Sequence, residues 1–356
     1  MSVPTVSIDG ALGEGGGQIL RTSLSLSTLL NIPFSIQNIR AHRKKKGLRP
    51  QHLTAVQASA QLAKAKLQGA IIGSGNLSYA PTQRSGGNHR FDIGTAGATT
   101  LLLHALYYPL ALGQQASQLT LIGGTHVDKA PTFDYLHHVW LPMLQACGLH
   151  AQVNLQRYGF YPKGGGQLDV RIPPQQQSHG VEIEQRPPLD RISIFSVFAS
   201  PQTKRNDRSG PQTISYQMGH SAQEVLQQMG WDSAFFCSEV QALSHGAVCL
   251  IVCHFGVLRA GFLSWGWKGR PAAQVGSEAA AMTAQFLKSP AIVDEWMADQ
   301  WLLPLALASS PSSYTTPFLS EHLRTNAHII QQFLPHVEIQ LKQEKHLGHI
   351  SIHPHT

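Results

Sequence analysis

Few features of this sequence set it apart from an ordinary globular protein. Only 4 of its 356 residues are cysteine and only 13% are charged, against 42% hydrophobic residues. So few cysteines do not make a disulfide framework in a chain of this length, and we expect a reduced, cytoplasmic setting. No apolar run is long enough to span a bilayer, and the N-terminus lacks the layout of a signal peptide, so no membrane partner is expected.

Acidic residues are also scarce relative to basic ones. The chain has 20 Asp and Glu against 27 Lys and Arg, which gives a formal charge of +7. This excess favours a polyanionic partner such as nucleic acid.

Cys249 and Cys253 lie in the strand-like run 247–255, and we expect them to be packed thiols rather than metal ligands.

The order of predicted elements repeats along the chain. In the first unit, hydrophobic periodicity predicts a strand, a helix, a strand, a helix and two short strands, at 3–8, 18–30, 34–39, 50–67, 70–79 and 89–93. The second unit has a helix at 97–112, a strand at 118–122, a helix from 131 to 148 and a hairpin at 151–172. The C-terminal part has helices at 276–288 and 291–307, a helix from 322 and a hairpin at 337–352. The sequence therefore predicts an α/β fold, with α+β layers built from three βαβαββ units.

The third unit is interrupted by a segment with its own βα pattern. The segment contains a strand, a helix and two strands, at 191–198, 212–229, 247–253 and 257–264, and the polar run 201–212 is predicted to be a mobile loop. We therefore expect a core domain made of residues 1–184 and 273–356, and a small α/β insert domain made of residues 185–272.

A glycine-rich turn, 13–17, joins the first predicted strand to the first helix. Bare backbone N–H groups at a helix N-terminus bind anions, and Arg21 lies one turn into the helix. Glu14 would repel a phosphate unless a divalent cation lay between them, which favours a metal-bridged nucleotide phosphate. A plain strand-to-helix turn is the alternative for an isolated glycine triplet.

The second helix of each predicted unit begins with polar or proline-containing residues. These starts are 47–52, 130–131 and 321–326, and they converge with the glycine turn if the units surround a pseudo-threefold axis. A basic run, 40–49, would border such a cleft, although a solvated loop has the same composition. His322, taken alone, is more typical of a helix-capping or core histidine than of a catalytic one.

Four separate motifs carry a resemblance to a known family. They are ‘DGALGEGGGQILRTSLSLS’ (9–27), ‘GLRPQHLTAV’ (47–56), ‘YGFYPKGGGQ’ (158–167) and ‘HLRTNA’ (322–327). In this order they resemble the RNA 3′-terminal phosphate cyclase family. The resemblance implies conversion of an RNA 3′-terminal phosphate and ATP into an RNA 2′,3′-cyclic phosphate, AMP and pyrophosphate.

The resemblance also implies roles for particular residues. His322 matches the histidine that becomes adenylylated, and Glu14 matches a carboxylate that binds Mg²⁺ or Mn²⁺. The positions that handle phosphates are Arg21, Arg40, Arg43, Gln51 and His52. The positions that bind the nucleotide are His104, Pro131, Trp296, Met297, Ala298, Asp299 and Gln300. Two of these depart from the family, which usually has Gln in place of His104 and Tyr in place of Trp296, so the nucleotide pocket is expected to differ in detail.

Two other classes of protein are compatible with parts of this pattern. Cyclase-like proteins that assist ribosome assembly share the fold but lack the nucleophilic histidine, and His322 argues against that class. Enolpyruvyl transferases also use repeated βαβαββ units, but the motifs at 47–56 and 322–327 argue against them.

Overall fold

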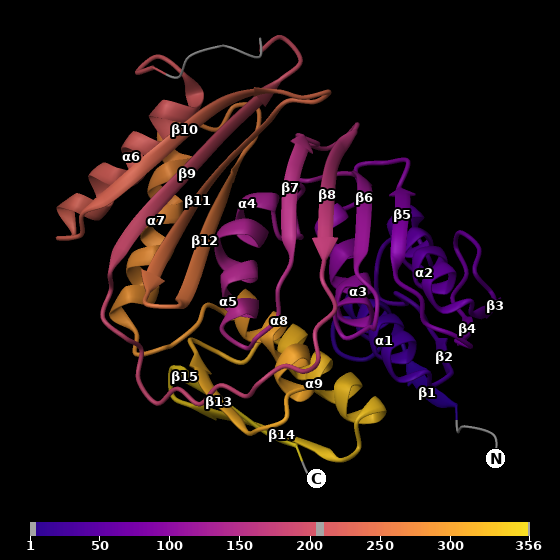
Figure 1. Ribbon diagram of the computed structural model, residues 1–356. Coiled ribbons are helices and arrows are strands. Elements are labelled where there is room, and N and C mark those ends of the chain that lie inside the picture. The colour runs from indigo at the N-terminus through magenta and orange to yellow at the C-terminus, as the bar shows by residue number, and fades with distance from the viewer. Residues whose placement is uncertain (1–4, 204–209, 355–356) are drawn as a thin grey trace.

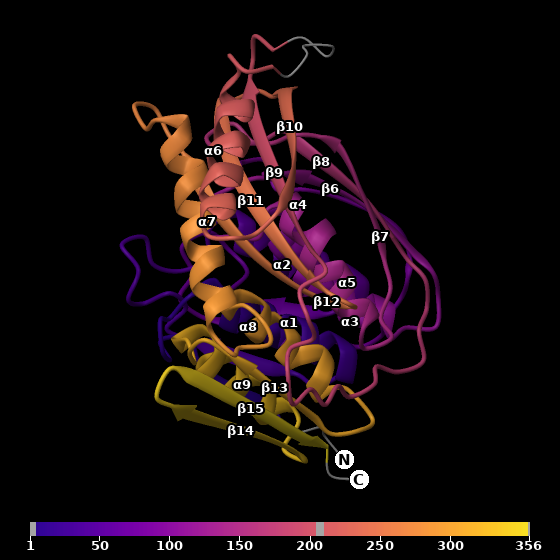
Figure 2. The ribbon, with the colours of Figure 1, turned by 90° about the vertical axis from the view of Figure 1, so that its left-hand side faces the viewer.

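The computed structural model describes residues 5–203 and 210–354, and Figure 1 shows their arrangement. Residues 204–209 of the run predicted to be a mobile loop lie outside these ranges. Within them, the strands form separate sheets that lie around a set of central helices (Figures 1 and 2). No helix in the described part of the chain is long and apolar enough to cross a membrane.

The first unit forms a sheet of order β1-β2-β4-β3, in which β1 and β2 are parallel. Its elements are β1 (Val6–Asp9), α1 (Gly17–Leu30), β2 (Phe34–Gln37), α2 (Pro50–Ala63), β3 (Lys66–Gln68) and β4 (Leu77–Ala80). The expected extension of the second helix to residue 67 is wrong. Lys64 takes a left-handed conformation, with φ 45°, and its N–H donates to the carbonyl of Ala60, which ends α2.

The second unit has the same strand order and directions, β5-β6-β8-β7. It contains β5 (Gly87–Asp92), α3 (Thr99–Ala111), β6 (Ser117–Gly123), the continuous helical run α4 (Phe133–Tyr135), η1 (Leu136–Trp140) and α5 (Leu141–Gln145), and then β7 (Gln152–Arg157) and β8 (Gly166–Ile172). The strand expected at 89–93 therefore opens the second unit and does not close the first, because β5 pairs in parallel with β6.

The third unit lacks a regular first strand among the described residues. It contains α8 (Glu295–Ala306), β13 (Ser312–Thr316), α9 (Glu321–Phe333), β14 (Val337–Glu344) and β15 (Leu347–Pro354), with strand order β13-β15-β14. Two parallel bridges, Ser178↔Ala308 and Glu182↔Ser313, lie where that strand would be. The chain segment just before the insert thus takes the place of the missing strand.

The insert contributes a sheet of order β10-β9-β11-β12, with helices α6 and α7 on one face (Figure 2). The strands and helices of this layer are β9 (Arg191–Ser200), α6 (Ile214–Gln228), β10 (Ser233–Gln241), β11 (Gly246–Phe255), β12 (Leu258–Gly266) and α7 (Ala272–Lys288), the last of which begins where the predicted insert ends. Although α7 was assigned to the third unit, it packs along α6, β11 and β12. Cys249 and Cys253 lie inside β11 and are fully buried, as predicted.

Helix α1 lies at the centre of the three units. It packs against α2 of its own unit, α3 of the second unit and α9 of the third. Small side chains line the buried part of α1 and let neighbouring helices approach closely: Thr22, Ser23, Ser25, Ser27 and Thr28. Because of this position, the N-terminus of α1 lies among residues from distant parts of the sequence.

Candidate active site

The glycine turn brings the start of α1 close to two other functional side chains. Helix α1 begins at Gly17 and carries no side-chain cap at Gly16. A Cβ atom at Gly17 would lie 2.5 Å from Nε2 of His52 and 2.9 Å from Nη1 of Arg21. Any larger residue would push these groups away, so glycine is required here for the close approach. The result is an uncapped helix N-terminus beside a guanidinium and an imidazole, which suits a phosphate.

Glu14, at the exposed tip of the same turn, contacts two residues from other segments. One carboxylate oxygen, Oε2, lies 2.9 Å from Nη2 of Arg43 and 3.2 Å from Nε2 of His322. All three side chains are between a third and a half exposed. The glycine turn, the basic loop and the start of α9 therefore meet at this carboxylate.

His322 is the second residue of α9, whose N-cap, Ser320, accepts a hydrogen bond from the N–H of Leu323. The Nδ1 atom of His322 lies 2.7 Å from Oε1 of Gln18. The amide group of Gln18 is oriented by Asp299, because its Nε2 donates to both carboxylate oxygens at 2.5 and 2.6 Å. The amide oxygen of Gln18 must therefore accept the hydrogen from Nδ1, which leaves the lone pair of a neutral ring on Nε2.

Asp299 is itself held in place from α9. The side-chain amide of Asn326 donates to Oδ1 of Asp299 at 2.9 Å and to its backbone carbonyl at 3.1 Å. The hydroxyl of Thr22, on α1, in turn donates to Oδ1 of Asn326 at 2.7 Å. Burial raises the pKa of Asp299, while His322 and the hydrogen bonds from Asn326 and Gln18 oppose that rise. The four hydrogen-bonded side chains connect α1, α8 and α9 and fix the ring of His322.

His52 and Arg21 face the glycine turn in contrasting charge states. Burial, together with Arg21, Arg40 and Arg49, lowers the pKa of His52 to about 3, so its ring is neutral at physiological pH. The backbone N–H of Arg49 donates to Nδ1 of His52 at 3.2 Å, which places the ring hydrogen on Nε2, toward Gly17. Burial lowers the pKa of Arg21 to about 10, and its guanidinium stays charged. Together they offer a neutral donor and a cationic donor to one anion.

Trp296 lies at the start of α8, next to the insert. The N-cap of this helix, Asp294, accepts hydrogen bonds from the backbone N–H groups of Trp296 and Met297, from the hydroxyl of Tyr135 and from the N–H of Gly261. This buried carboxylate joins α8 to the second unit and to β12. The indole is 39% exposed, so it keeps a free surface on which a nucleobase can stack.

His104 has a buried polar atom that none of the described residues satisfies. Its ring stacks on Trp140, with 4.7 Å between ring centroids, and its Nε2 is buried with no hydrogen-bond partner among the described residues. Burial, with a contribution from Arg21, lowers the pKa of His104 to about 3. A neutral, unpaired ring nitrogen is costly unless a ligand completes its hydrogen bond.

The site has one candidate ligand for a divalent cation. No group of three or more His, Cys, Asp or Glu side chains in residues 5–203 and 210–354 could hold a metal ion. Glu14 nevertheless fits Mg²⁺ or Mn²⁺, because these cations commonly bind one protein carboxylate together with phosphate oxygens of the substrate. The residues present therefore suit a cation that arrives with a nucleotide.

Most of this chain matches a known protein family. Residues 12–340 match the family model described as RNA 3′-terminal phosphate cyclase. The chain belongs to this family. It is 36% identical to the RNA 3′-terminal phosphate cyclase of Gloeothece citriformis, over 95% of this chain and 96% of the relative. The corresponding proteins of Trichormus variabilis and Ralstonia nicotianae are 38% and 37% identical, over 92% and 98% of this chain and 94% and 97% of theirs.

Membership of the cyclase family makes the chain an enzyme of that class and excludes the enolpyruvyl transferases. The structure brings several predicted residues into one cluster: Glu14, Arg21, Arg43, His52, Asp299 and His322. Gln51 lies at its border, where Oε1 accepts a hydrogen bond from the N–H of Ala98 at the start of α3.

Several other residues that were predicted for the site of this cyclase are buried or make hydrogen bonds outside this cluster. Arg40 donates to the carbonyls of Lys45 and Gly47 and so shapes the basic loop. The side chains of Met297 and Ala298 are fully buried. Gln300 donates to the carbonyl of Trp296, and the carbonyl of Pro131 accepts a hydrogen bond from Thr100 on α3.

Sequence reasoning missed Gln18 and Asn326 as site residues. Both stand inside the motifs that carry the resemblance to the cyclases, but neither is titratable or nucleophilic. Gln18 meets Asp299 across 281 positions of sequence and His322 across 304. Periodicity and spacing show no such pair, so only the position of Gln18 directly after the glycines could have drawn attention to it.

Proposed function

We propose that this chain converts an RNA 3′-terminal phosphate into a 2′,3′-cyclic phosphate with ATP, through an AMP bound covalently to His322. The observation that carries the proposal is the orientation of His322, whose Nδ1 is bonded to Gln18 and whose Nε2 faces Glu14. With Nδ1 held by Gln18, the neutral form of this ring carries its lone pair on Nε2, and such an imidazole is a competent nucleophile toward phosphorus.

The reaction consists of three displacements at phosphorus. Nε2 of His322 attacks the α-phosphorus of ATP, a nitrogen–phosphorus bond forms, and the bond to the bridging oxygen breaks as pyrophosphate leaves. An oxygen of the RNA 3′-phosphate then attacks the same phosphorus and releases the histidine, which gives an RNA–AMP anhydride. The terminal 2′-hydroxyl finally attacks the RNA phosphorus, loses its proton, and expels AMP.

The residues around His322 bind and orient the charged groups in these steps. Arg21 and Arg43 neutralise phosphate charge, and the N-terminus of α1 and Nε2 of His52 donate hydrogen bonds. Glu14 would hold Mg²⁺ or Mn²⁺, which supplies charge neutralisation between the carboxylate and the phosphates. We place this reaction in the cytoplasm, with RNA ending in a 3′-phosphate as the substrate.

Glu14→Ala is expected to raise the concentration of Mg²⁺ or Mn²⁺ needed for self-adenylylation. Since the carboxylate is the cation's protein ligand in this proposal, its loss should shift the midpoint of the metal titration by about tenfold or more. Glu321→Ala, which removes a carboxylate from the residue next to His322, is the matched control. Overlapping titrations for Glu14→Ala and the unmodified protein would make Glu14 a turn residue only.

Gln18→Leu is expected to slow self-adenylylation while leaving the protein folded. Leucine keeps the volume but removes the acceptor for Nδ1 of His322 and the donor to Asp299, so the ring loses its orientation. A hydrogen bond to a charged network is worth about 1.5–3 kcal/mol, which corresponds to roughly 10- to 150-fold in rate. The measurement is the rate of label incorporation from α-labelled ATP across a range of pH.

Gln61→Leu provides the control for this change, because Gln61 also contacts a histidine, His89, but on an exposed part of α2. A purely structural role for Gln18 would lower thermal stability without changing the pH dependence of labelling. That outcome would remove Gln18 from the proposed mechanism.

Trp296→Ala is expected to raise the ATP concentration needed for half-maximal labelling by about tenfold. Stacking of a nucleobase on an aromatic side chain is worth about 1–3 kcal/mol. Trp231→Ala, which truncates a half-buried tryptophan of the insert, should leave the ATP dependence unchanged. If Trp296→Ala behaves like Trp231→Ala, the adenine does not stack on Trp296.

A further inference from the structure

The insert carries an exposed tryptophan that is held in one orientation. Trp267 is 65% exposed and comes directly after β12, which is an edge strand of the insert sheet. Its ring stacks on a cation, because the guanidinium carbon of Arg270 lies 4.3 Å from the ring centroid. A cation–π contact of this kind restrains a side chain that would otherwise move freely on the surface.

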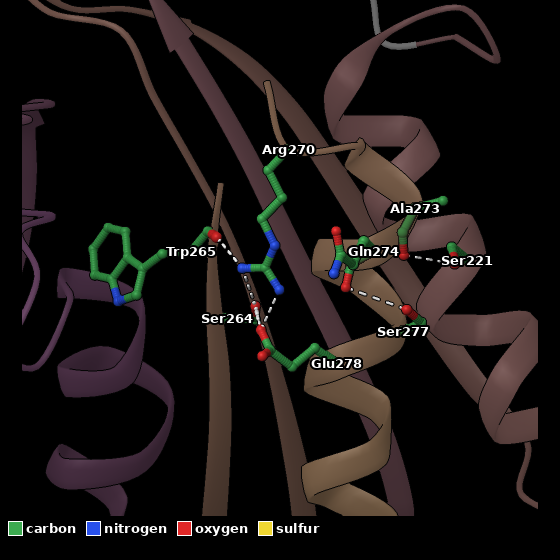
Figure 3. A network of polar contacts seen from close by, with 8 residues as sticks. All are labelled: Ser221, Ser264, Trp265, Arg270, Ala273, Gln274, Ser277 and Glu278. Atoms are coloured by element: carbon green, nitrogen blue, oxygen red, sulfur yellow. Dashed lines mark hydrogen bonds and ion pairs between the residues drawn. The ribbon is translucent and has the colours of Figure 1, made fainter. Parts of the chain in front are cut away.

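Arg270 is fixed by the residues around it, as Figure 3 shows. Its Nη1 donates to the carbonyl of Trp265 at 2.5 Å and to Oγ of Ser264 at 3.2 Å, and its Nη2 donates to Oε2 of Glu278 on α7 at 2.5 Å. The side chain of Arg270 is only 5% exposed. One part of the indole surface thus rests on a buried, immobilised guanidinium, while the rest is open to a partner.

Trp267 is connected to the proposed nucleotide pocket by β12. At the middle of this strand, the ring of Phe262 lies 6.3 Å from the ring of Trp296. Trp267 follows five residues later, which corresponds to about 16 Å along an extended strand. Helix α7 accompanies β12 over this distance, since it contacts Phe262 through Phe286 and Arg270 through Glu278. The two exposed tryptophans therefore lie along one seam between β12 and α7.

We infer that Trp267, supported by Arg270, binds a nucleobase of the RNA strand several nucleotides before the 3′-terminal phosphate. This inference rests on the proposed function. Every base has a π-face, so stacking on an indole is independent of sequence. Lys268 is exposed beside Trp267, and the formal charge of +7 suits a polyanion. The insert would thereby extend the RNA site beyond the residues that handle the terminal phosphate.

The test compares short and long RNAs ending in a 3′-phosphate. A dinucleotide fits the terminal-phosphate site alone, whereas an RNA of about a dozen nucleotides can also reach a stacking platform. For Trp267→Ala we expect kcat/KM with the longer RNA to fall by about tenfold, the size of a lost base stack. The value for the dinucleotide, and self-labelling with ATP, should stay unchanged, and Trp267→Phe should retain most of the activity on the longer RNA.

Phe236→Ala is the matched control. Phe236 is also a large exposed side chain of the insert, at 56%, but it lies on β10, the opposite edge of the sheet. Equal losses for both RNAs, an equal loss in Phe236→Ala, or no loss in Trp267→Ala would each overturn the inference.

Anisotropy of fluorescently labelled RNA separates this inference from the proposed reaction. If neither RNA is cyclised by a protein that labels itself with AMP, the proposed reaction fails. Weaker binding of the longer RNA by Trp267→Ala would support the platform even then, and unchanged binding would refute it.

Discussion

Replacing His322 with alanine is expected to abolish both the transfer of AMP from ATP to the protein and the cyclisation of RNA. Removal of the nucleophile in covalent catalysis typically costs several orders of magnitude in rate, because the remaining groups bind substrate but form no bond. The measurement is incorporation of label from α-labelled ATP in the presence of Mg²⁺ or Mn²⁺. The label on the unmodified protein should be lost in acid and kept in alkali, as a phosphorus–nitrogen bond requires.

The fold should survive this substitution, since the side chain of His322 is nearly half exposed. The free energy of unfolding of the variant, followed by thermal melting, is expected to change by about 0.5 kcal/mol or less. His328→Ala supplies the control, because His328 is an exposed histidine of the same helix that contacts Gln332 and no residue of the site cluster. Label that remains in His322→Ala, or that survives acid, would place the nucleophile on another residue. Helix α9 would then act without forming a covalent bond, or would take no part in the reaction.

A substrate with a 2′-deoxyribose at its 3′-phosphorylated end is expected to stop the reaction at the RNA–AMP anhydride. The first displacement involves only ATP and His322, and the second needs only the RNA 3′-phosphate, whereas the third needs the 2′-hydroxyl as its nucleophile. Accumulation of adenylylated RNA, with no phosphatase-resistant cyclic end, is the predicted result on a denaturing gel. The ordinary ribose substrate should show the anhydride only transiently.

The same substrates test how the terminal phosphate is bound. Each phosphate contact made by a residue such as Arg21 or Arg43 releases counterions, so the affinity for RNA should fall steadily as salt rises. If the deoxy substrate never receives AMP although the protein labels itself, the RNA 3′-phosphate is not the acceptor. The nucleotidyl chemistry at His322 would then stand, and the substrate assignment would be wrong.

Much of the fold could be predicted from the sequence because its signals are local. The uncapped start of α1 follows from glycines at 15–17, and the close approach at Gly17 shows why a side chain is excluded there. The convergence of helix starts was also correct for α2 and α9, which supply His52 and His322. The carbonyl of Pro131, before the second unit's helical run, instead accepts a hydrogen bond from Thr100 of α3, and Ala98 at the start of α3 meets Gln51.

The remaining errors in the fold arose where tertiary contacts decide the structure. Strand β10 was not predicted, because its residues alternate between half-buried and exposed with none fully buried, and its sequence gives little hydrophobic alternation. Helix α7 has the length and periodicity of a core helix, but its partners, α6 and β12, lie in the insert. The division into a core and an insert at residues 185–272 stays a prediction.

The site residues show more clearly than the fold that contacts between distant segments cannot be predicted from local sequence. Charged and nucleophilic residues, such as Glu14 and His322, are recognised from chemistry and motif. Neutral residues that orient them, such as Gln18 and Asn326, become visible only when distant segments meet. A hydrogen bond from Gln18 to Asp299 joins helices of the first and third units, and no property of either residue in isolation indicates it.

A single-turnover chase tests the covalent route most directly. The protein is first labelled with α-labelled ATP, freed of ATP, and then given RNA ending in a 3′-phosphate. If AMP on His322 lies on the reaction path, label should leave the protein as cyclic ends appear, with one cyclic end formed for each AMP released. Label that stays on the protein while RNA remains unconverted, or cyclic ends that form only when fresh ATP is added, would contradict the covalent histidine intermediate.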